Sequence, residues 1–226
     1  MTSISQDRPF IRALLGAGIA AAALVALAPA AQTTPMPRDV IAGCTPAAAG
    51  QPNGKQWPVE PALTIDTAAS HTATLETTCG TITIALDVAA APRTVNSFAF
   101  LAGEGYFDHT RCHRLTTQGI FVLQCGDPTA TGMGGPGYKF GDENLAGAVY
   151  PAGTVAMANA GPGTNGSQFF LVYRDTRLPP NYTPFGTITE GMDALANVAN
   201  AGVAGGGADG APVADVVFNA VTTAQG

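Results

Sequence analysis

Short apolar runs broken by glycine-rich turns limit what this chain can fold into more than any other feature. Residues 72–78 and 81–87 flank a Cys-Gly pair, and apolar side chains alternate with more polar ones in the second run. This period of two predicts a β-hairpin that buries one face. Residues 213–221 alternate in the same way and predict the last strand of the chain.

Two stretches have the spacing of an amphipathic helix. The first opens at Pro92, and its apolar residues Val95, Phe98 and Leu101 recur every three or four positions. Residues 192–198 repeat this spacing near the end of the chain, so both stretches predict helices with one buried side. Several strands with two helices favour a mainly β fold, a closed barrel with one helix over each end.

The first 30 residues are interpreted as a targeting segment. Arg8 and Arg12 precede an apolar run over residues 13–28, and Ala-Pro-Ala at 28–30 has the small residues of a signal-peptide cleavage site. A cleaved export signal is the preferred interpretation. An uncleaved anchor through residues 13–31 stays open, because the run is close to the minimum of about 17–18 apolar residues that span a bilayer. Either way, a secreted or cell-envelope protein is expected.

Lipidation is a third alternative for the N-terminal region. Residues 41–44, Ile-Ala-Gly-Cys, resemble the sequence that bacterial lipoproteins modify at cysteine, but Arg38 and Asp39 separate them from the apolar run, so this alternative ranks last. Residues 31–70 are rich in Pro, Ala and Gly and have no regular period, which predicts a linker or a loosely draped arm. Residues 71–226 are then one domain, expected to be a monomer.

The chain is acidic. It has 10 lysine and arginine residues against 16 aspartate and glutamate residues, a net charge of −6. Removal of residues 1–30 takes away Arg8, Arg12 and Asp7, which leaves 8 basic and 15 acidic residues and a net charge of −7. An acidic chain without a basic run is a poor partner for nucleic acid or anionic lipid. No nucleic acid is expected as a partner, and membrane contact is expected only through residues 13–31 if they are retained.

Four cysteines behind an export signal favour disulfides over metal or thiol chemistry, and three pairings are possible. His109, Cys112, His113 and Cys125 are residue types that bind zinc. If residues 112–114 form a strand, however, Cys112 and His113 point to opposite faces. No metal site is therefore predicted, and zinc is kept as the weaker alternative.

Two glycine-rich segments, residues 132–137 and 161–166, fit the G-x-G-x-x-G spacing of dinucleotide sites. Neither opens a helical pattern, each contains a proline, and no βαβ unit adjoins them. Turn formation explains these glycines better. The sequence also has no Gly-x-Ser-x-Gly elbow for nucleophilic catalysis, and no cofactor is expected.

Two segments carry most of the functional information. Residues 112–127 contain His-Arg followed by Phe-Val-Leu-Gln-Cys-Gly-Asp, and residues 157–170 read Met-Ala-Asn-Ala-Gly-Pro-Gly-Thr-Asn-Gly-Ser-Gln-Phe-Phe. Both closely resemble the cyclophilin family of peptidyl-prolyl cis-trans isomerases, and the resemblance extends over residues 72–225. It implies an eight-stranded antiparallel closed barrel capped by two helices, with the active site in a groove on the outer face.

The resemblance also implies an activity and the residues that perform it. The activity is non-covalent, cofactor-free rotation about X-Pro bonds of exported proteins, which assists their folding, so proline-containing polypeptides are the expected partners. The expected catalytic residues are Arg114, Phe121, Gln124 and Asn159. The expected substrate-binding residues are Val122, Ala158, Gln168, Phe170, Leu178 and Tyr182.

The rim of the implied proline pocket departs from the family's common form. Val122 stands where members often have methionine, Arg177 where animal members have tryptophan, and Tyr182 where they have histidine. Cyclosporin is therefore expected to bind weakly. Two other functions compete with this one. The first is a binding or chaperone module that holds proline-containing segments but isomerises them poorly, and the second is a catalytically inert structural protein of the cell envelope. The retained Arg114 argues against both.

The implied barrel also predicts the disulfides. It places the strands that carry the His-Arg and Phe-x-x-Gln elements side by side and antiparallel, so Cys112 and Cys125 should be near enough to bridge. Cys79 lies in the turn of the first hairpin, where it is expected to be exposed and able to meet an arm that carries Cys44. Such a Cys44–Cys79 bridge would tie down the arm.

Overall fold

The computed structural model describes residues 43–226. The expected targeting segment, its alternative as a membrane anchor and the beginning of the expected arm lie outside the described residues. No helix within residues 43–226 is long and apolar enough to cross a membrane.

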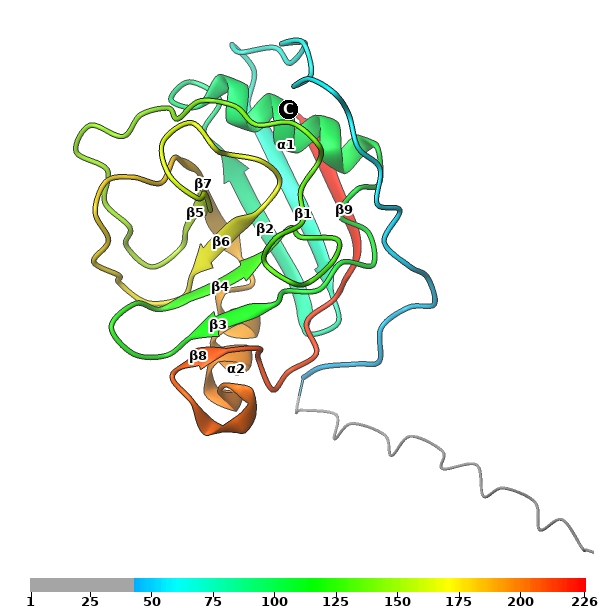
Figure 1. The fold of residues 1–226 in the computed structure, drawn as a ribbon, viewed down its shortest axis with the longest axis vertical. Helices are drawn as coiled ribbons and strands as arrows, with labels where there is room; N and C mark the ends of the chain where they lie inside the picture. Colours follow the sequence, from blue (N-terminus) through cyan, green and yellow to red (C-terminus); the bar gives the residue numbers. More distant parts are fainter. Residues whose placement is uncertain (1–42) are drawn as a thin grey trace, which may run out of the picture. The chain divides into compact units, whose positions relative to one another are not determined.

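The domain is built on one antiparallel sheet that curls around an apolar core (Figure 1). The strand order is β8-β3-β4-β6-β5-β7-β2-β1-β9. The expected mainly β, antiparallel fold is confirmed. The strands are β1 (His71–Thr77), β2 (Gly80–Leu86), β3 (Arg114–Thr116), β4 (Val122–Cys125), β5 (Thr154–Met157), β6 (Phe169–Val172), β7 (Pro184–Glu190), β8 (Asp209–Gly210) and β9 (Phe218–Gln225).

The strand count and the closure of the barrel differ from the expectation. The sheet has nine strands instead of eight, because the two-residue strand β8 adds an edge beside β3. Edge strands β8 and β9 are not neighbours in this described sheet. Backbone just before β3 bonds instead to the start of β9, where Cys112 N–H donates to Val216 C=O at 2.9 Å and Phe218 N–H to Thr110 C=O at 3.0 Å. The result is a curled half-barrel whose open side is joined by these bonds.

The first hairpin forms as the alternating pattern predicts. β1 and β2 pair from His71 with Leu86 to Thr77 with Gly80, so the turn is Thr78-Cys79. The last strand was misplaced, because β9 begins at residue 218 rather than 213. Residues 216–218 are buried in succession, and the N–H of residue 216 bonds back to the C=O of residue 214 at 3.0 Å. This tight turn breaks the extended backbone that an alternating strand requires.

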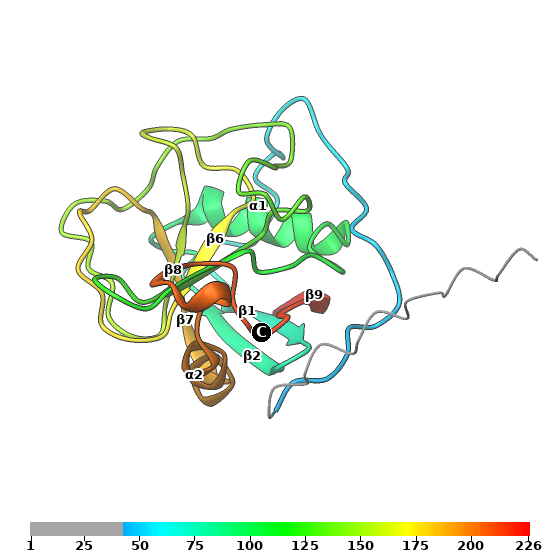
Figure 2. The same ribbon diagram turned by 60° about the horizontal axis from the view of Figure 1, so that its bottom comes forward.

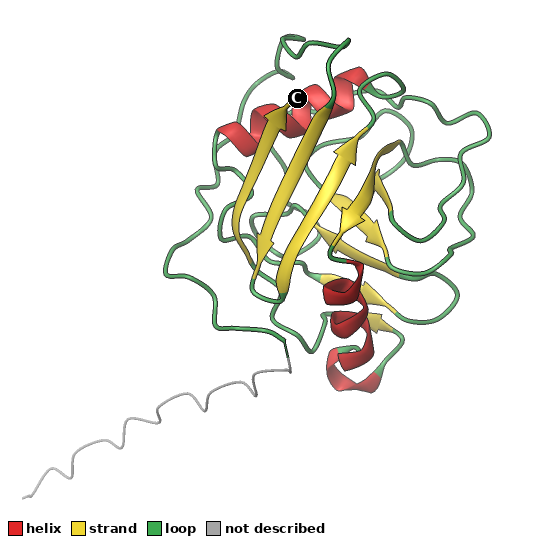
Figure 3. Cartoon of the chain, turned by 180° about the vertical axis from the view of Figure 1, so that it is seen from behind, coloured by secondary structure: helices red, strands yellow, loops and turns green. Residues whose placement is uncertain are grey.

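The two helices α1 (Pro92–Gly103) and α2 (Met192–Ala201) form where helical spacing was found. α1 crosses one end of the long strands β9, β1 and β2, and α2 lies near the other end (Figure 3). Pro92 opens α1, where its missing N–H has no intrahelical partner to lose. The N–H groups of Arg93 and Thr94 donate to the carboxylate of Glu143 at 3.1 and 2.8 Å, so a side chain distant in sequence caps the helix.

Aromatic rings fill the inside of the curled sheet. Phe98 of α1 stacks on Phe107, with ring centroids 5.0 Å apart, and meets Phe169 of β6 edge-on at 5.5 Å. Phe169 in turn stacks on Phe218 of β9 at 6.1 Å. Burial of each such ring stabilises the fold by about 1.5–3 kcal/mol. The inner face of β6 is thereby fixed in the core, which sets the direction of the side chains on its outer face.

The described part of the arm, residues 43–70, has no helix or strand and runs along the outside of the domain past β9 toward α1 (Figures 1 and 2). On α1, the Asn96 side chain accepts a hydrogen bond from Thr64 N–H at 2.9 Å. The Trp57 ring meets Phe100 of the same helix, with centroids 5.1 Å apart. These contacts pack the arm against the domain rather than draping it loosely. The boundary between arm and domain at residue 70 stays a prediction.

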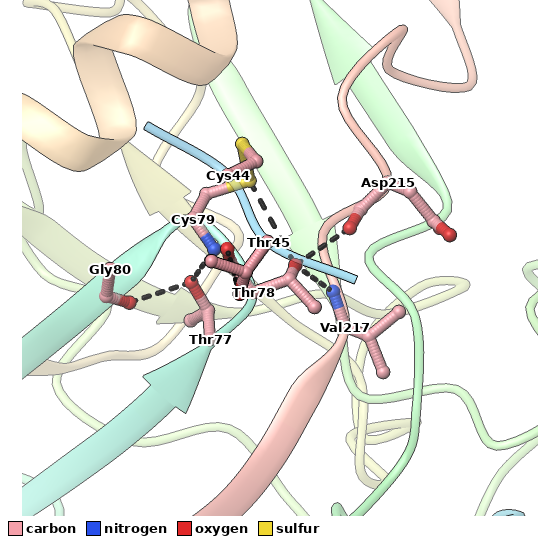
Figure 4. Close-up of a disulfide and its surroundings, with 8 residues drawn as sticks. All are labelled: Cys44, Thr45, Thr77, Thr78, Cys79, Gly80, Asp215 and Val217. Carbon is pink, nitrogen blue, oxygen red and sulfur yellow. Dashed lines mark hydrogen bonds between the residues drawn. A yellow bond between two sulfur atoms is a disulfide. The ribbon is translucent and has the colours of Figure 1, made fainter. Parts of the chain in front are cut away.

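A disulfide joins Cys44 to Cys79 and confirms the predicted link between the arm and the first hairpin (Figure 4). The Thr78 hydroxyl next to it donates to the Asp215 carbonyl at 2.6 Å and accepts from Val217 N–H at 3.0 Å. Cys79 was expected to be exposed, but its exposed fraction is only 5%. The expectation was wrong because the arm and the segment before β9 cover the turn.

A second disulfide joins Cys112 to Cys125, as the adjacent strands predicted. Both side chains are buried in the core. Sulfur atoms bonded to each other are not free to bind zinc as thiolates, which removes the zinc alternative built on these two residues. Within residues 43–226, no three or more His, Cys, Asp or Glu side chains gather so as to hold a metal ion.

Candidate active site

The candidate site lies on the outer face of the sheet, where β3, β4 and β6 pair side by side. Successive side chains of a strand point to opposite faces. In β4, Leu123 and Cys125 belong to the core, whereas Val122 joins a separate apolar cluster and Gln124 is half-buried. β6 repeats the pattern, because Phe170 joins the outer cluster. The alternation therefore collects polar and apolar groups on one outer surface.

Three polar side chains form a line across this surface. Arg114 and Gln124 are directly opposite each other on β3 and β4, and Arg114 Nη1 donates to Gln124 Oε1 at 3.3 Å. Gln124 Nε2 donates to Gln168 Oε1 at 2.8 Å. Gln168 Nε2 then donates to the carbonyls of Gly132 and Gly134 at 2.9 and 3.0 Å. Each side chain in the line is thus oriented by the next, and the last one is anchored to backbone.

Asp209 holds the other side of Arg114, a role that the sequence analysis did not predict. Its carboxylate accepts two hydrogen bonds, from Arg114 Nε at 2.8 Å and from Nη2 at 2.7 Å. The two-residue strand β8 brings Asp209 to the site by pairing with β3. A two-point contact between a planar guanidinium and a carboxylate fixes direction as well as distance. Arg114 is therefore clamped between Asp209 and Gln124.

The charges around Arg114 are set by these contacts. The hydrogen bond from Arg114 lowers the pKa of Asp209, and the same bond raises the pKa of Arg114. Burial lowers the pKa of the neighbouring His113 imidazole below its usual 6.5. At neutral pH the site therefore holds an ionised Arg114–Asp209 pair beside an uncharged His113.

The apolar part of the site is a cluster apart from the main core. Phe170 meets the Tyr182 ring edge-on, with centroids 5.6 Å apart. Tyr150, which the sequence analysis did not assign, supports this rim by donating from its hydroxyl to the Tyr182 carbonyl at 2.8 Å. The buried members of the cluster are Val122, Tyr150, Ala156, Phe170 and Val172, and the half-buried ones include Ala158, Leu178 and Tyr182.

Phe121 lies just before β4 and is only half-buried. Its backbone N–H donates to the Thr176 hydroxyl at 2.9 Å, which ties it to the loop after β6. The Arg174 guanidinium carbon is 3.5 Å from the centre of the Phe121 ring, a cation–π arrangement. Phe121 therefore stands at the edge of the site with one face covered by an arginine.

Asn159 and Ala158 follow β5 and border the polar line. Ala158 N–H donates to Gln168 C=O at 2.9 Å. The Asn159 side chain donates to Asn181 C=O at 2.9 Å and accepts from Gly161 N–H at 3.2 Å, so it holds two loops together. Within the described residues, the backbone N–H and C=O of Asn159 form no hydrogen bond.

The loop over residues 127–134 is shaped by Asp127, which is fully buried. Burial alone would raise the pKa of this carboxyl, but hydrogen bonds from Thr129, Gly134 and Gly132 outweigh burial, and the net pKa is lowered. A Cβ on Gly134 would lie 2.0 Å from Asp127 Oδ1, so glycine is required there. The loop shaped in this way presents the Gly132 and Gly134 carbonyls to the Gln168 side chain.

Two cavities adjoin the site. One of about 340 Å³ lies beside the polar line, and Gln124, Asn159 and Lys139 are among its lining residues. Another of about 440 Å³ lies beside the apolar cluster, and Tyr150, Arg177 and Leu178 are among its lining residues. All the sequence-predicted site residues thus lie in the polar line, in the apolar cluster or beside them, with Phe121 just before β4 and Asn159 after β5. Their individual roles stay predictions.

Comparison with known proteins gives consistent results. The family model described as cyclophilin type peptidyl-prolyl cis-trans isomerase/CLD matches residues 72–223. A protein of Mycobacterium leprae named probable peptidyl-prolyl cis-trans isomerase B is 49% identical over 167 residues, which cover 68% of this chain and 57% of that protein. The protein of the same name from Mycobacterium tuberculosis H37Rv is 51% identical over 156 residues, covering 63% and 51%. The chain thus spans about half the length of these curated relatives.

Solved structures show the same fold. A cyclophilin type peptidyl-prolyl cis-trans isomerase of Cryptosporidium parvum superposes with a TM-score of 0.61 at 27% identity, covering 70% of this chain and 99% of that one. A second structure of that protein, determined in the presence of the dipeptide Ala-Pro, gives a TM-score of 0.60 at 28% identity, with coverage of 69% and 99%.

Proposed function

This chain belongs to the cyclophilin type peptidyl-prolyl cis-trans isomerase family, and from that premise we propose that its domain catalyses rotation about X-Pro peptide bonds. The observation that carries the proposal is the Arg114 guanidinium, held between Asp209 and Gln124 beside an apolar cluster. The cluster suits a proline ring, and the guanidinium supplies a fixed donor. The dipeptide Ala-Pro present with the Cryptosporidium parvum relative supports substrates that contain proline.

The chemical task is to twist an amide. Amide resonance sets a barrier of about 18–20 kcal/mol, and uncatalysed X-Pro exchange takes tens to hundreds of seconds. As the C–N bond twists, the proline nitrogen becomes pyramidal and regains its lone pair. A donor aimed at that nitrogen stabilises the twisted state over both planar states. Arg114 performs this role, and its clamp by Asp209 and Gln124 means that no reorganisation is needed when the bond twists.

The rest of the site holds the substrate while one side of the bond turns. Phe121, Val122, Phe170 and Leu178 contain the proline ring, with Tyr182 at the rim. The free backbone groups of Asn159 and the side chain of Gln124 bind the adjoining peptide backbone. An apolar surround also disfavours the more polar planar amide.

A protease-coupled assay on an Ala-Pro-Phe peptide tests the proposal. Chymotrypsin cleaves only the trans form, so added isomerase should accelerate the slow phase in proportion to its concentration. Binding of the peptide without acceleration would instead support a proline-binding module that does not turn over. Neither binding nor acceleration would contradict the proposed function altogether.

The rate should be nearly independent of pH between about pH 7 and 9, because the reaction transfers no proton and His113 and Asp209 both have lowered pKa values. An aspartate with a lowered pKa keeps its ion pair above its usual value of 3.8 and loses it only as the pH falls through the lowered value. kcat/KM measured across this range should be flat. A step of threefold or more near pH 7.5 would point to general acid–base catalysis instead.

Asp209→Asn is expected to lower kcat/KM about two- to fivefold. An amide has one acceptor oxygen, so it cannot accept both Arg114 hydrogen bonds, and the guanidinium loses part of its orientation. The side chains of Arg114 and Asp209 are 40% and 53% exposed, so solvent limits the pair to about 1 kcal/mol or less. The matched control is Glu104→Gln, which removes an exposed ion pair with Lys55 away from the site. The proposed clamp requires a kcat/KM loss in the Asp209 variant that this control does not share.

The proposed substrates are exported proteins whose folding waits on proline isomerisation, and the proposed location is outside the cytoplasm. The targeting pattern in residues 1–30 and the two disulfides support this. N-terminal sequencing of protein recovered from medium and envelope fractions tests it. A cleaved form or an anchored form would each fit export, whereas unprocessed protein confined to the cytoplasm would contradict it. Lipidation at Cys44 is not expected, because its sulfur is bonded to Cys79.

Cyclosporin is expected to bind weakly, because Arg177 stands where animal members have the tryptophan that helps hold this ligand. Arg177 is exposed and lines the cavity beside Leu178, where an indole would add apolar surface. Arg177→Trp should therefore tighten binding in a fluorescence titration. Tight binding by the natural sequence, unchanged in Arg177→Trp, would show that the rim residue does not decide affinity.

A further inference from the structure

The described cations fall into two groups. Away from the site, Lys55, Arg93 and Arg111 are each paired with a carboxylate, and Arg114 is paired with Asp209 within it. The remaining cations of residues 43–226 are exposed and form no salt bridge with a described carboxylate, and all border the candidate active site. They are Lys139, Arg174 and Arg177.

Lys139 stands at one end of the site. It lines the cavity of about 340 Å³ together with Gln124 and Asn159, the residues proposed to bind substrate backbone. A peptide bound along these residues would pass its side chains close to the Lys139 ammonium group. A carboxylate in this cavity would meet an unpaired cation.

Arg174 and Arg177 stand at the other end. Arg174 covers one face of Phe121 at 3.5 Å, and Arg177 precedes Leu178 and lines the cavity of about 440 Å³. Asp175 lines the same cavity, but its Oδ1 accepts the Ala152 N–H at 2.9 Å and it forms no salt bridge with either arginine. Both arginines therefore keep donors free for a ligand.

We propose that this isomerase prefers prolines flanked by acidic residues. Lys139 attracts the carboxylate on one side of the proline, and the Arg174–Arg177 pair attracts the carboxylate on the other side. The inference rests on the proposed function and names its substrate class. The chain as a whole carries a net charge of −6, so overall charge repels an acidic peptide. Attraction must come from cations close to the bound peptide, and unpaired cations gather at both ends of the site.

The test compares peptides that differ only in charge. Glu and Gln have the same shape, so each peptide with Glu before the proline, after it or on both sides has a matched peptide with Gln. NMR exchange measures kcat/KM for each peptide, after the uncatalysed isomerisation rate of that peptide is subtracted. We expect about a two- to fivefold preference for each Glu position, the range of single exposed ion pairs. Raising ionic strength from about 0.05 to about 0.5 M shortens the screening length from about 14 to about 4 Å and should shrink the preference.

Variants assign the preference to residues. Lys139→Gln should lower the Glu/Gln ratio at one position, and Arg174→Gln with Arg177→Gln should lower it at the other. Lys55→Gln removes the same charge away from the site and should leave both ratios unchanged. Equal kcat/KM for Glu and Gln peptides, or the same loss in Lys55→Gln, would overturn the inference while leaving the isomerase proposal intact. Failure to accelerate any peptide, including the Gln versions, would overturn the proposed function instead.

Discussion

Arg114→Ala is expected to lower kcat/KM for an X-Pro peptide by at least about tenfold, which corresponds to about 1.4 kcal/mol of transition-state stabilisation. The variant removes the donor proposed to face the proline nitrogen, and it takes away the hydrogen bonds that Asp209 and the Gln124 side-chain oxygen accept from Arg114. The fold should survive, because the Arg114 side chain is 40% exposed and belongs to no core cluster. The protease-coupled assay measures the loss, and circular dichroism checks the fold.

Two further substitutions separate charge from geometry. Arg114→Lys keeps a positive charge but cannot make the forked contact with Asp209, so it should recover only part of the activity. Arg111→Ala removes an arginine on the same segment that is paired with Asp215, and it should keep kcat/KM close to the natural value. A folded Arg114→Ala protein with undiminished kcat/KM would remove the proposed mechanism.

Local periodicity was enough to predict the hairpin β1–β2 and both helices. In each case the buried face repeats within a single element, so no distant contact is needed to recognise it. The resemblance also placed the strands that carry Arg114 and Gln124 side by side and antiparallel, which the pairing of β3 with β4 confirms. Residues 213–217 were misread because Ala214, Val216 and Val217 are buried where the chain turns, and their apolar character alone imitates a strand.

Long-range contacts explain what the sequence could not reveal. Asp209 lies 95 residues from Arg114 in the sequence, two positions after the three glycines 205–207. Its strand has two residues, which is shorter than any detectable period. The arm posed the same difficulty, because Trp57 and the Asn96–Thr64 bond hold it without regular structure. Each case has a signal in the sequence: Asp209 precedes a glycine, and Trp57 is the only tryptophan of the chain. Neither signal indicates which residue it contacts.

Loss of either disulfide should destabilise the domain strongly, and the two losses should differ in their effect on activity. The bridges close loops with sequence separations of 35 for Cys44–Cys79 and 13 for Cys112–Cys125. In the chain-entropy model these closures are worth about 4 and about 3 kcal/mol of unfolding free energy, respectively. Double substitution to alanine is the suitable change, because serine would bury hydroxyls where the cysteines are 0–5% exposed in three of the four positions.

The difference in activity follows from where each bridge lies. Cys112 and Cys125 flank the pairing of Arg114 with Gln124. Removal of this disulfide loosens the two strands that orient the Arg114 guanidinium. It should therefore lower kcat/KM at temperatures where the domain is still folded. Cys44–Cys79 ties the arm to the first hairpin, which carries no proposed site residue, so its removal should lower the unfolding free energy with kcat/KM nearly unchanged. Urea unfolding and the peptide assay on both double variants measure the two quantities separately. Equal loss of kcat/KM in both would mean that general loosening, rather than the aim of Arg114, limits the rate.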